Sequence, residues 1–296
     1  MTSASANPGP AIPAGAAPPL RLGAVSYLNT LPLIEGLDKL EGVDLTRAAP
    51  SRLADLLEAG RLDAALAPVI EAQRSTHHFA FLAVGMIGSD GPTFTVRLYS
   101  AEPIEKIKRV HADTDSRTSI ALLRIILAER FGITPEIVSF DARERIATFD
   151  NATTAEPSEW PPAMLLIGDK VVTSSPPAVR YPHQIDLGEQ WALLTGLPFV
   201  YALWMCRADH AQDAAIRAAA AVLDRQRRHN VTRLDWIVTN RAPALGWPLD
   251  LARSYIGSML RYELGDRERD AVARFFELAE KHGVIEERRP IEWIEA

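Results

Sequence analysis

Short apolar runs alternate with helix-like segments from residue 21 to residue 69, and this alternation limits the fold more than any other feature of the chain. Strand-like runs lie at 22–25, 43–45 and 62–68, and segments with helical spacing lie at 33–37 and 51–59. Strands that alternate with helices are typical of a mainly parallel sheet covered by helices. We therefore predict an α/β fold.

A second series of the same kind runs from about 110 to 185. Strand-like runs lie at 109–112, 137–140 and 164–167, and a helical segment at 118–131 ends at Gly132. A chain of 296 residues exceeds the usual size of one domain. We predict two lobes with a ligand cleft between them, and crossings near residues 97 and 199. Lobe 1 is then discontinuous, 21–97 plus 200–296, and lobe 2 spans 98–199.

The two ends of the chain differ in character. Residues 1–20 are rich in Ala and Pro without Lys or Arg, and we expect a disordered tail rather than a secretory signal. Residues 211–226, 233–240, 249–260 and 267–282 have helical patterns, so we predict C-terminal helices. We assign the large aromatic residues of this part, Trp236, Trp247 and Tyr255, to packing.

Composition excludes several classes of function. The net charge is −6, and the only compact basic group, residues 225–229, fits a solvated helix end better than a nucleic-acid site. Cys206 is the single cysteine, so we expect no disulfide and a reducing compartment. The missing secretory signal favours a cytoplasmic location, and an apolar fraction of 47% with 24% charged residues argues against membrane insertion. The seven histidines lack metal-ligand spacing, and no phosphate-binding glycine loop occurs. We predict no metal site and no dependence on a nucleotide; the oligomeric state stays open.

The first candidate site wall is the segment 24–33, where an apolar run opens into polar side chains. Ser26, Tyr27, Asn29 and Thr30 lie just before a helix marked by Pro32. Helix N-termini carry unpaired N–H groups that bind small anions. We therefore expect an anionic ligand at this strand end.

The second candidate wall is the start of the helix at 118–131. Ser116, Arg117, Thr118 and Ser119 follow a predicted strand. Their hydroxyls, the guanidinium and the helix dipole suit a carboxylate. An ordinary helix cap with Arg117 in solvent explains the same residues equally well.

Two shorter segments are weaker candidates. Ser89 lies in a turn-rich link at 88–95, which a plain turn explains almost as well. Gly168 and Asp169 follow a buried strand, the position at which α/β proteins usually arrange ligands, although Asp169 also suits a simple cap.

Taken together, five segments resemble the chorismate dehydratase family of the futalosine route to menaquinone. They are 26–30 (SYLNT), 115–119 (DSRTS), 166–169 (LIGD), 186–191 (DLGEQW) and 195–200 (TGLPFV). The resemblance implies a type II periplasmic-binding-protein-like fold in which two α/β lobes close over a small ligand. It also implies a cofactor-free dehydration of chorismate to 3-[(1-carboxyvinyl)oxy]benzoate.

The resemblance also suggests roles for the candidate residues. Thr118 and Ser119, helped by Arg117, would hold one substrate carboxylate, while Ser26 and Asn29 would orient the ring and the leaving hydroxyl. A substrate carboxylate is the favoured base, and Asp169 is a weaker candidate. The chain departs from the family pattern at 93–95 and at 170–172; we expect Lys170 to point to solvent.

Three other functions remain open. A non-catalytic receptor for a small carboxylate has the same architecture, because fold alone does not establish catalysis. A related enzyme acting on a dihydroxynaphthoate precursor would need a histidine base, for which no comparable motif occurs. A regulatory ligand-binding domain is disfavoured because no DNA-binding segment accompanies it.

Overall fold

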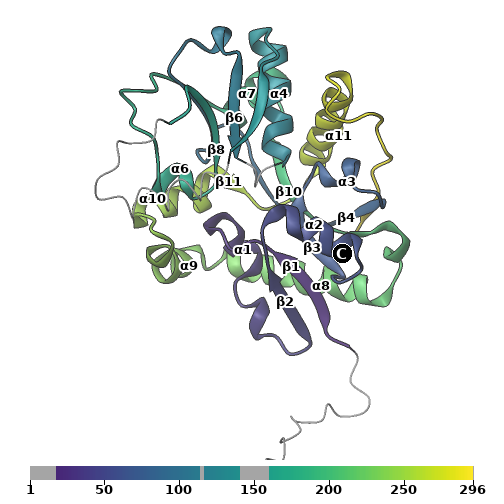
Figure 1. Cartoon of the computed structure of the whole chain (residues 1–296). Coiled ribbons are helices and arrows are strands. Elements are labelled where there is room, and N and C mark those ends of the chain that lie inside the picture. The colour runs from purple at the N-terminus through teal and green to yellow at the C-terminus, as the bar shows by residue number, and fades with distance from the viewer. Residues whose placement is uncertain (1–17, 114–116, 141–159, 296) are drawn as a thin grey trace, which may run out of the picture.

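The computed structural model contains two β-sheets with helices packed around them (Figure 1). It describes residues 18–113, 117–140 and 160–295. The first sheet has the strand order β11-β4-β10-β3-β1-β2, and β12 pairs with β4. Its strands are β1 (Leu20–Ala24), β2 (Val43–Arg47), β3 (Ala64–Pro68), β4 (Phe79–Ser89), β10 (Phe199–Arg207), β11 (Leu260–Arg261) and β12 (Trp293–Ile294).

The second sheet has the order β7-β6-β8-β5-β9. Its strands are β5 (Val96–Ser100), β6 (Arg109–Asp113), β7 (Glu136–Phe140), β8 (Ala163–Ile167) and β9 (His183–Asp186). The chain therefore leaves the first sheet after β4 and returns to it at β10. The two-lobed α/β architecture predicted above is confirmed. Leu20 already belongs to β1, inside the stretch that was expected to be a tail.

The sheets are mixed rather than mainly parallel. Within each alternating series the strands are parallel, as predicted: β1 pairs in parallel with β2 and β3, and β6 with β7 and β8. The first strand after each crossing runs the other way, since β10 is antiparallel to β3 and β4, and β5 is antiparallel to β8 and β9. After each crossing the chain enters the sheet from the cleft side. The first strand that it forms there, β5 or β10, therefore runs opposite to the neighbouring strands of the alternating series.

Helices cover the faces of both sheets. The first lobe carries η1 (Leu28–Thr30), α1 (Leu31–Ile34), η2 (Leu37–Lys39), α2 (Pro50–Glu58) and α3 (Glu71–Arg74). The second carries η3 (Ile104–Lys106), α4 (Arg117–Phe131), α6 (Lys170–Thr173) and α7 (Leu187–Thr195). Proline at the first helical position starts α2, because its fixed φ suits a helix and its missing N–H would be unpaired there.

The C-terminal part is helical, as predicted. It contains η4 (Ala208–His210), α8 (Ala214–Val231), α9 (Leu234–Arg241), η5 (Pro243–Leu245), α10 (Leu249–Ser254), the π-helical turn η6 (Tyr255–Met259) and α11 (Asp266–Lys281). Helix α11 joins the lobes, because Phe275 packs against both Trp191 of α7 and Phe199 of β10, with ring centroids 6.1 and 5.1 Å away. None of the helices in the described ranges is long and apolar enough to cross a membrane.

Two packing predictions need correction. Trp247 and Tyr255 are buried, and their rings stack with centroids 4.8 Å apart. Trp236, in contrast, is 40% exposed, and the guanidinium groups of Arg233 and Arg241 lie 4.7 and 5.4 Å from its ring centroid. Within the basic group 225–229, Arg227 is not in solvent: it donates to the Val84 carbonyl and pairs with Asp224 of its own helix.

Candidate functional site

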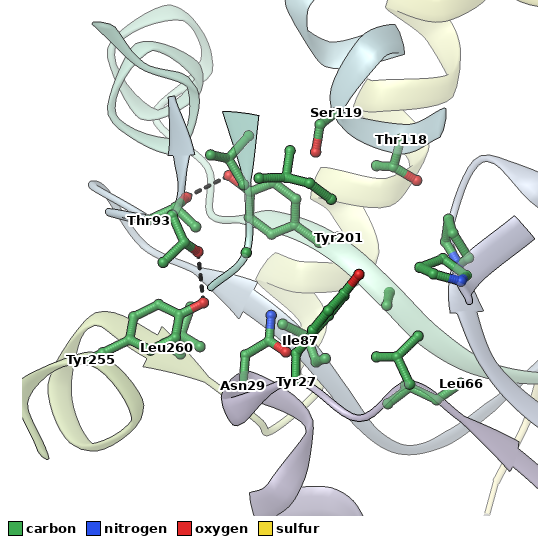
Figure 2. A pocket seen from close by; sticks show the side chains of 18 residues that line it. Tyr27, Asn29, Leu66, Ile87, Thr93, Thr118, Ser119, Tyr201, Tyr255 and Leu260 are labelled. Carbon is green, nitrogen blue, oxygen red and sulfur yellow. Dashed lines mark hydrogen bonds between the residues drawn. The ribbon is translucent and has the colours of Figure 1, made fainter. Parts of the chain in front are cut away.

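A pocket lies between the two lobes and is lined by both of them (Figure 2). Its free space is about 690 Å³, a volume that includes open solvent at the mouth. The lining is mainly apolar, with a few polar side chains. These polar residues are Tyr27, Asn29, Thr93, Thr95, Thr118, Ser119, Tyr201 and Tyr255.

The turn after β1 forms one wall. Tyr27 and Asn29 line the pocket, and their side chains lie next to each other in Figure 2. The buried Thr30 hydroxyl donates to Asn29 Oδ1 at 3.1 Å, which leaves the amide NH₂ of Asn29 directed elsewhere. Ser26 is exposed and is not part of the lining. The turn therefore presents a fixed amide to the pocket, with Thr30 behind it.

The first turn of α4 forms the opposite wall. Thr118 and Ser119 are buried residues that line the pocket. Thr118 Oγ1 accepts a hydrogen bond from the backbone N–H of Ile70 at 3.3 Å, so its own proton is not used in that bond. Arg117 is not in the lining; its Nη1 lies 3.0 Å from Glu71 Oε2. Ser116 lies outside the described residues.

The segment that crosses between the lobes supplies two threonines, Thr93 and Thr95, from the link at 88–95 in which only Ser89 is a named candidate above. Thr93 is hydrogen-bonded to Tyr201, and Thr95 to Tyr255 at 2.6 Å, as the dashed lines in Figure 2 show. Burial raises the pKa of both tyrosines, so their hydroxyls stay protonated. Ser89 is buried below this segment, 3.0 Å from Thr93 Oγ1, and does not line the pocket.

Asp186 holds the crossing segment in place. Its carboxylate accepts hydrogen bonds from the backbone N–H groups of Thr93 and Phe94, at 2.9 and 2.6 Å, and also caps α7 through Gly188. Phe94 has φ of 70°, a backbone conformation that costs a residue with a side chain about 1 kcal/mol or more. The two hydrogen bonds that the Asp186 carboxylate accepts stabilise this conformation.

The end of β8 forms the floor. Gly168 lines the pocket with φ of 64°, and its N–H donates to the Thr95 carbonyl at 2.8 Å. Asp169 follows it behind the lining. Burial raises the pKa of Asp169 to about 6, although the Trp247 indole, the Leu28 N–H and Lys170 act in the opposite direction. A carboxyl with this pKa titrates just below neutral pH.

Lys170 does not point to solvent, contrary to the expectation above. Its residue is only 9% exposed, and its ammonium pairs with the buried Asp113 at the end of β6. The physical reason is that α6 begins directly after β8, which turns Lys170 inward towards the neighbouring parallel strand. Among the described residues no group of His, Cys, Asp and Glu side chains is arranged to hold a metal ion.

The pocket thus brings together five of the residues selected from the sequence: Tyr27, Asn29, Thr118, Ser119 and Gly168. Tyr201 was not selected because it lies in the apolar run 199–206, which indicates only burial, and Tyr255 was assigned to packing alone, although it also lines the pocket. The hydroxyl groups of these tyrosines could have indicated a polar site, since a buried tyrosine needs a hydrogen-bond partner.

Comparison with known proteins shows that the chain is similar to proteins of menaquinone biosynthesis. A family model described as menaquinone biosynthesis matches residues 20–281. A curated relative named chorismate dehydratase, from Thermus thermophilus, is 27% identical over 274 residues, which cover 88% of this chain and 94% of that protein.

Solved structures show the same fold at low identity. The alkanesulfonate-binding protein of Xanthomonas axonopodis pv. citri, bound to MOPS, has a TM-score of 0.65 at 17% identity and covers 95% of this chain and 100% of that one. A protein of Archaeoglobus fulgidus has a TM-score of 0.63 at 15% identity, over 90% of this chain and 98% of its own. The fold is therefore that of periplasmic binding proteins.

Proposed function

This chain belongs to the menaquinone biosynthesis family, and we propose that it is a chorismate dehydratase that forms 3-[(1-carboxyvinyl)oxy]benzoate and water in the futalosine route. One observation carries the proposal: a single pocket receives the Tyr27–Asn29 turn from one lobe and the start of α4 from the other. Chorismate has two carboxylates and a ring hydroxyl, so it needs donors on more than one side. The name of the Thermus thermophilus relative supports the same substrate.

The binding roles follow from position. Thr118 and Ser119 bind one carboxylate at the positive end of α4, and Arg117 stands beside them. Asn29 orients the ring and the leaving hydroxyl, held by Thr30. Tyr27 and Gly168 shape the pocket wall and floor. Ser26 remains a candidate at the exposed side of the same turn, and Ser89 supports the crossing segment.

The reaction needs one base and assistance to a leaving group. A ring proton passes to the base and the ring C–O bond breaks, so that the ring becomes aromatic; the base then gives that same proton to the departing hydroxide, which leaves as water. Aromatisation supplies the driving force, so we propose that no cofactor takes part. The substrate's own carboxylate is favoured as the base, because Asp169 lies behind the lining rather than in it.

We also propose that the enzyme acts in the cytoplasm. Its only cysteine, Cys206, is buried in β10 and unpaired, which suits a reducing compartment.

The test is an assay of the purified protein with chorismate and without added metal, following loss of substrate and formation of the aromatic product. Asn29→Ala is expected to lower kcat/KM by about 100-fold or more, because a donor at the reacting centre is lost. Asn240→Ala, an exposed amide on α9, is the matched control and should retain full activity. Wild-type activity in Asn29→Ala would refute the role of Asn29. Binding of chorismate without turnover would instead favour a small-carboxylate receptor.

A further inference from the structure

One ion pair joins the two lobes next to the pocket. Glu71 is the first residue of α3, directly after β3 of lobe 1, and Arg117 is the first residue of α4 in lobe 2. Arg117 Nη1 lies 3.0 Å from Glu71 Oε2. The two residues are far apart in the sequence, so the contact exists only because the lobes meet here.

A second bond runs alongside this pair. The backbone N–H of Ile70 donates to Thr118 Oγ1 at 3.3 Å. Two consecutive residues of lobe 1 therefore hold two consecutive residues of lobe 2. Since Thr118 and Ser119 line the pocket, these contacts fix the wall that we assign to a substrate carboxylate.

Glu71 depends on Arg117 for its charge balance. The residue is only 1% exposed, and its Oε1 has no hydrogen-bond partner among the described residues. Burial raises the pKa of Glu71, and the Arg117 guanidinium opposes that rise more than Arg74, the next cation. A buried carboxylate with one partner costs free energy if that partner leaves. Arg117 is therefore expected to stay paired with Glu71.

We propose that Glu71 is a positioning residue: through Arg117 it holds the first turn of α4 against lobe 1, so that Thr118 and Ser119 meet the substrate carboxylate. The identity of that substrate rests on the proposed function. The competing arrangement has Arg117 leaving Glu71 to bind the carboxylate itself. The two arrangements predict opposite effects of removing the Glu71 charge.

The test compares Glu71→Gln, Arg117→Gln and the double variant. We expect Glu71→Gln to raise both KM for chorismate and Kd for the aromatic product about tenfold, with kcat changed less than about threefold. The double variant should bind no more weakly than Arg117→Gln alone, because both changes remove one interaction. Unchanged or tighter binding by Glu71→Gln, or additive losses in the double variant, would overturn the proposal.

Glu129→Gln is the matched control, because Glu129 pairs α4 with Lys281 of α11 at the other end of the same helix. It should leave KM unchanged. Hydrogen exchange without ligand separates this proposal from the proposed function. Amides 121–124, which bond to the carbonyls of the first turn of α4, should exchange faster in Glu71→Gln and not in Glu129→Gln. Equal exchange in the two variants would refute the positioning role even if chorismate proved not to be the substrate.

Discussion

The carboxyl of Asp169 predicts how the stability of this protein changes with pH. Burial raises its pKa from 3.8 to about 6, despite opposing effects from the Trp247 indole and the Leu28 N–H. At 1.36 kcal/mol per pH unit, this difference corresponds to about 3 kcal/mol of unfolding free energy. Asp169→Asn removes the charge and keeps the shape, so it should recover up to about that amount where the carboxyl is ionised.

The direction in which the free energy of unfolding changes with pH follows from proton binding. Because the folded-state pKa lies above the unfolded value, the folded protein binds more protons between pH 3.8 and about 6. The contribution of Asp169 to stability is present below this window and is lost as the pH rises through it. The variant should therefore match the wild type near pH 4 and exceed it above pH 7.

Thermal unfolding of both proteins from pH 4 to pH 8 measures the effect. A gain of about 3 kcal/mol corresponds to a Tm that is about 6 °C higher at pH 8, with no difference at pH 4. An offset that does not change with pH would refute the reasoning. The same variant tests the chemistry: loss of turnover with intact folding and binding would favour Asp169 over the substrate carboxylate as the base.

Two further substitutions test the packing and charge arguments. Burial raises the pKa of Asp224, but hydrogen bonds from neighbouring arginines of α8 outweigh this effect and lower the pKa overall. Asp224→Asn should therefore lower Tm at pH 7. This loss of Tm should vanish at a pH below the folded-state pKa of Asp224. Gly188→Ala would place a methyl group 2.1 Å from Thr93 Oγ1, so it should lower the free energy of unfolding by about 3 kcal/mol or more in chemical denaturation. Gly257→Ala is the control: a methyl group there meets no atom within 4 Å and should cause no such steric clash. Equal losses in the two glycine variants would contradict the packing argument.

Local patterns were sufficient for most elements of the two alternating series, for the C-terminal helices and for two pocket walls. The polar cluster after β1 and the hydroxyls at the start of α4 are visible because strand ends and helix starts carry short-range signals. Both walls lie in the pocket, represented by Asn29 and Thr118. The lobe limits at residues 97 and 199 stay predictions, and so do the roles of the site residues, which the assays above address.

The partners of buried charges were not visible in the sequence. Lys170 is typical of a surface position by its residue type, and no sequence pattern singles out Glu71, yet each is buried in an ion pair with a residue of another element. Such pairs depend on which strands neighbour each other and on how the lobes meet. Those relations are set by contacts between distant segments, which composition and periodicity do not encode.

The sequence by itself determined the α/β class, the helical C-terminal part and the segments that carry polar groups, because these depend on residue spacing and on local backbone preferences. Only the tertiary structure decided that Tyr201 and Tyr255 reach the crossing threonines, that Asp186 holds the crossing backbone, and that Arg117 faces Glu71. Each of these contacts joins residues from separate elements. They exist because packing of the two lobes brings those elements together around one pocket.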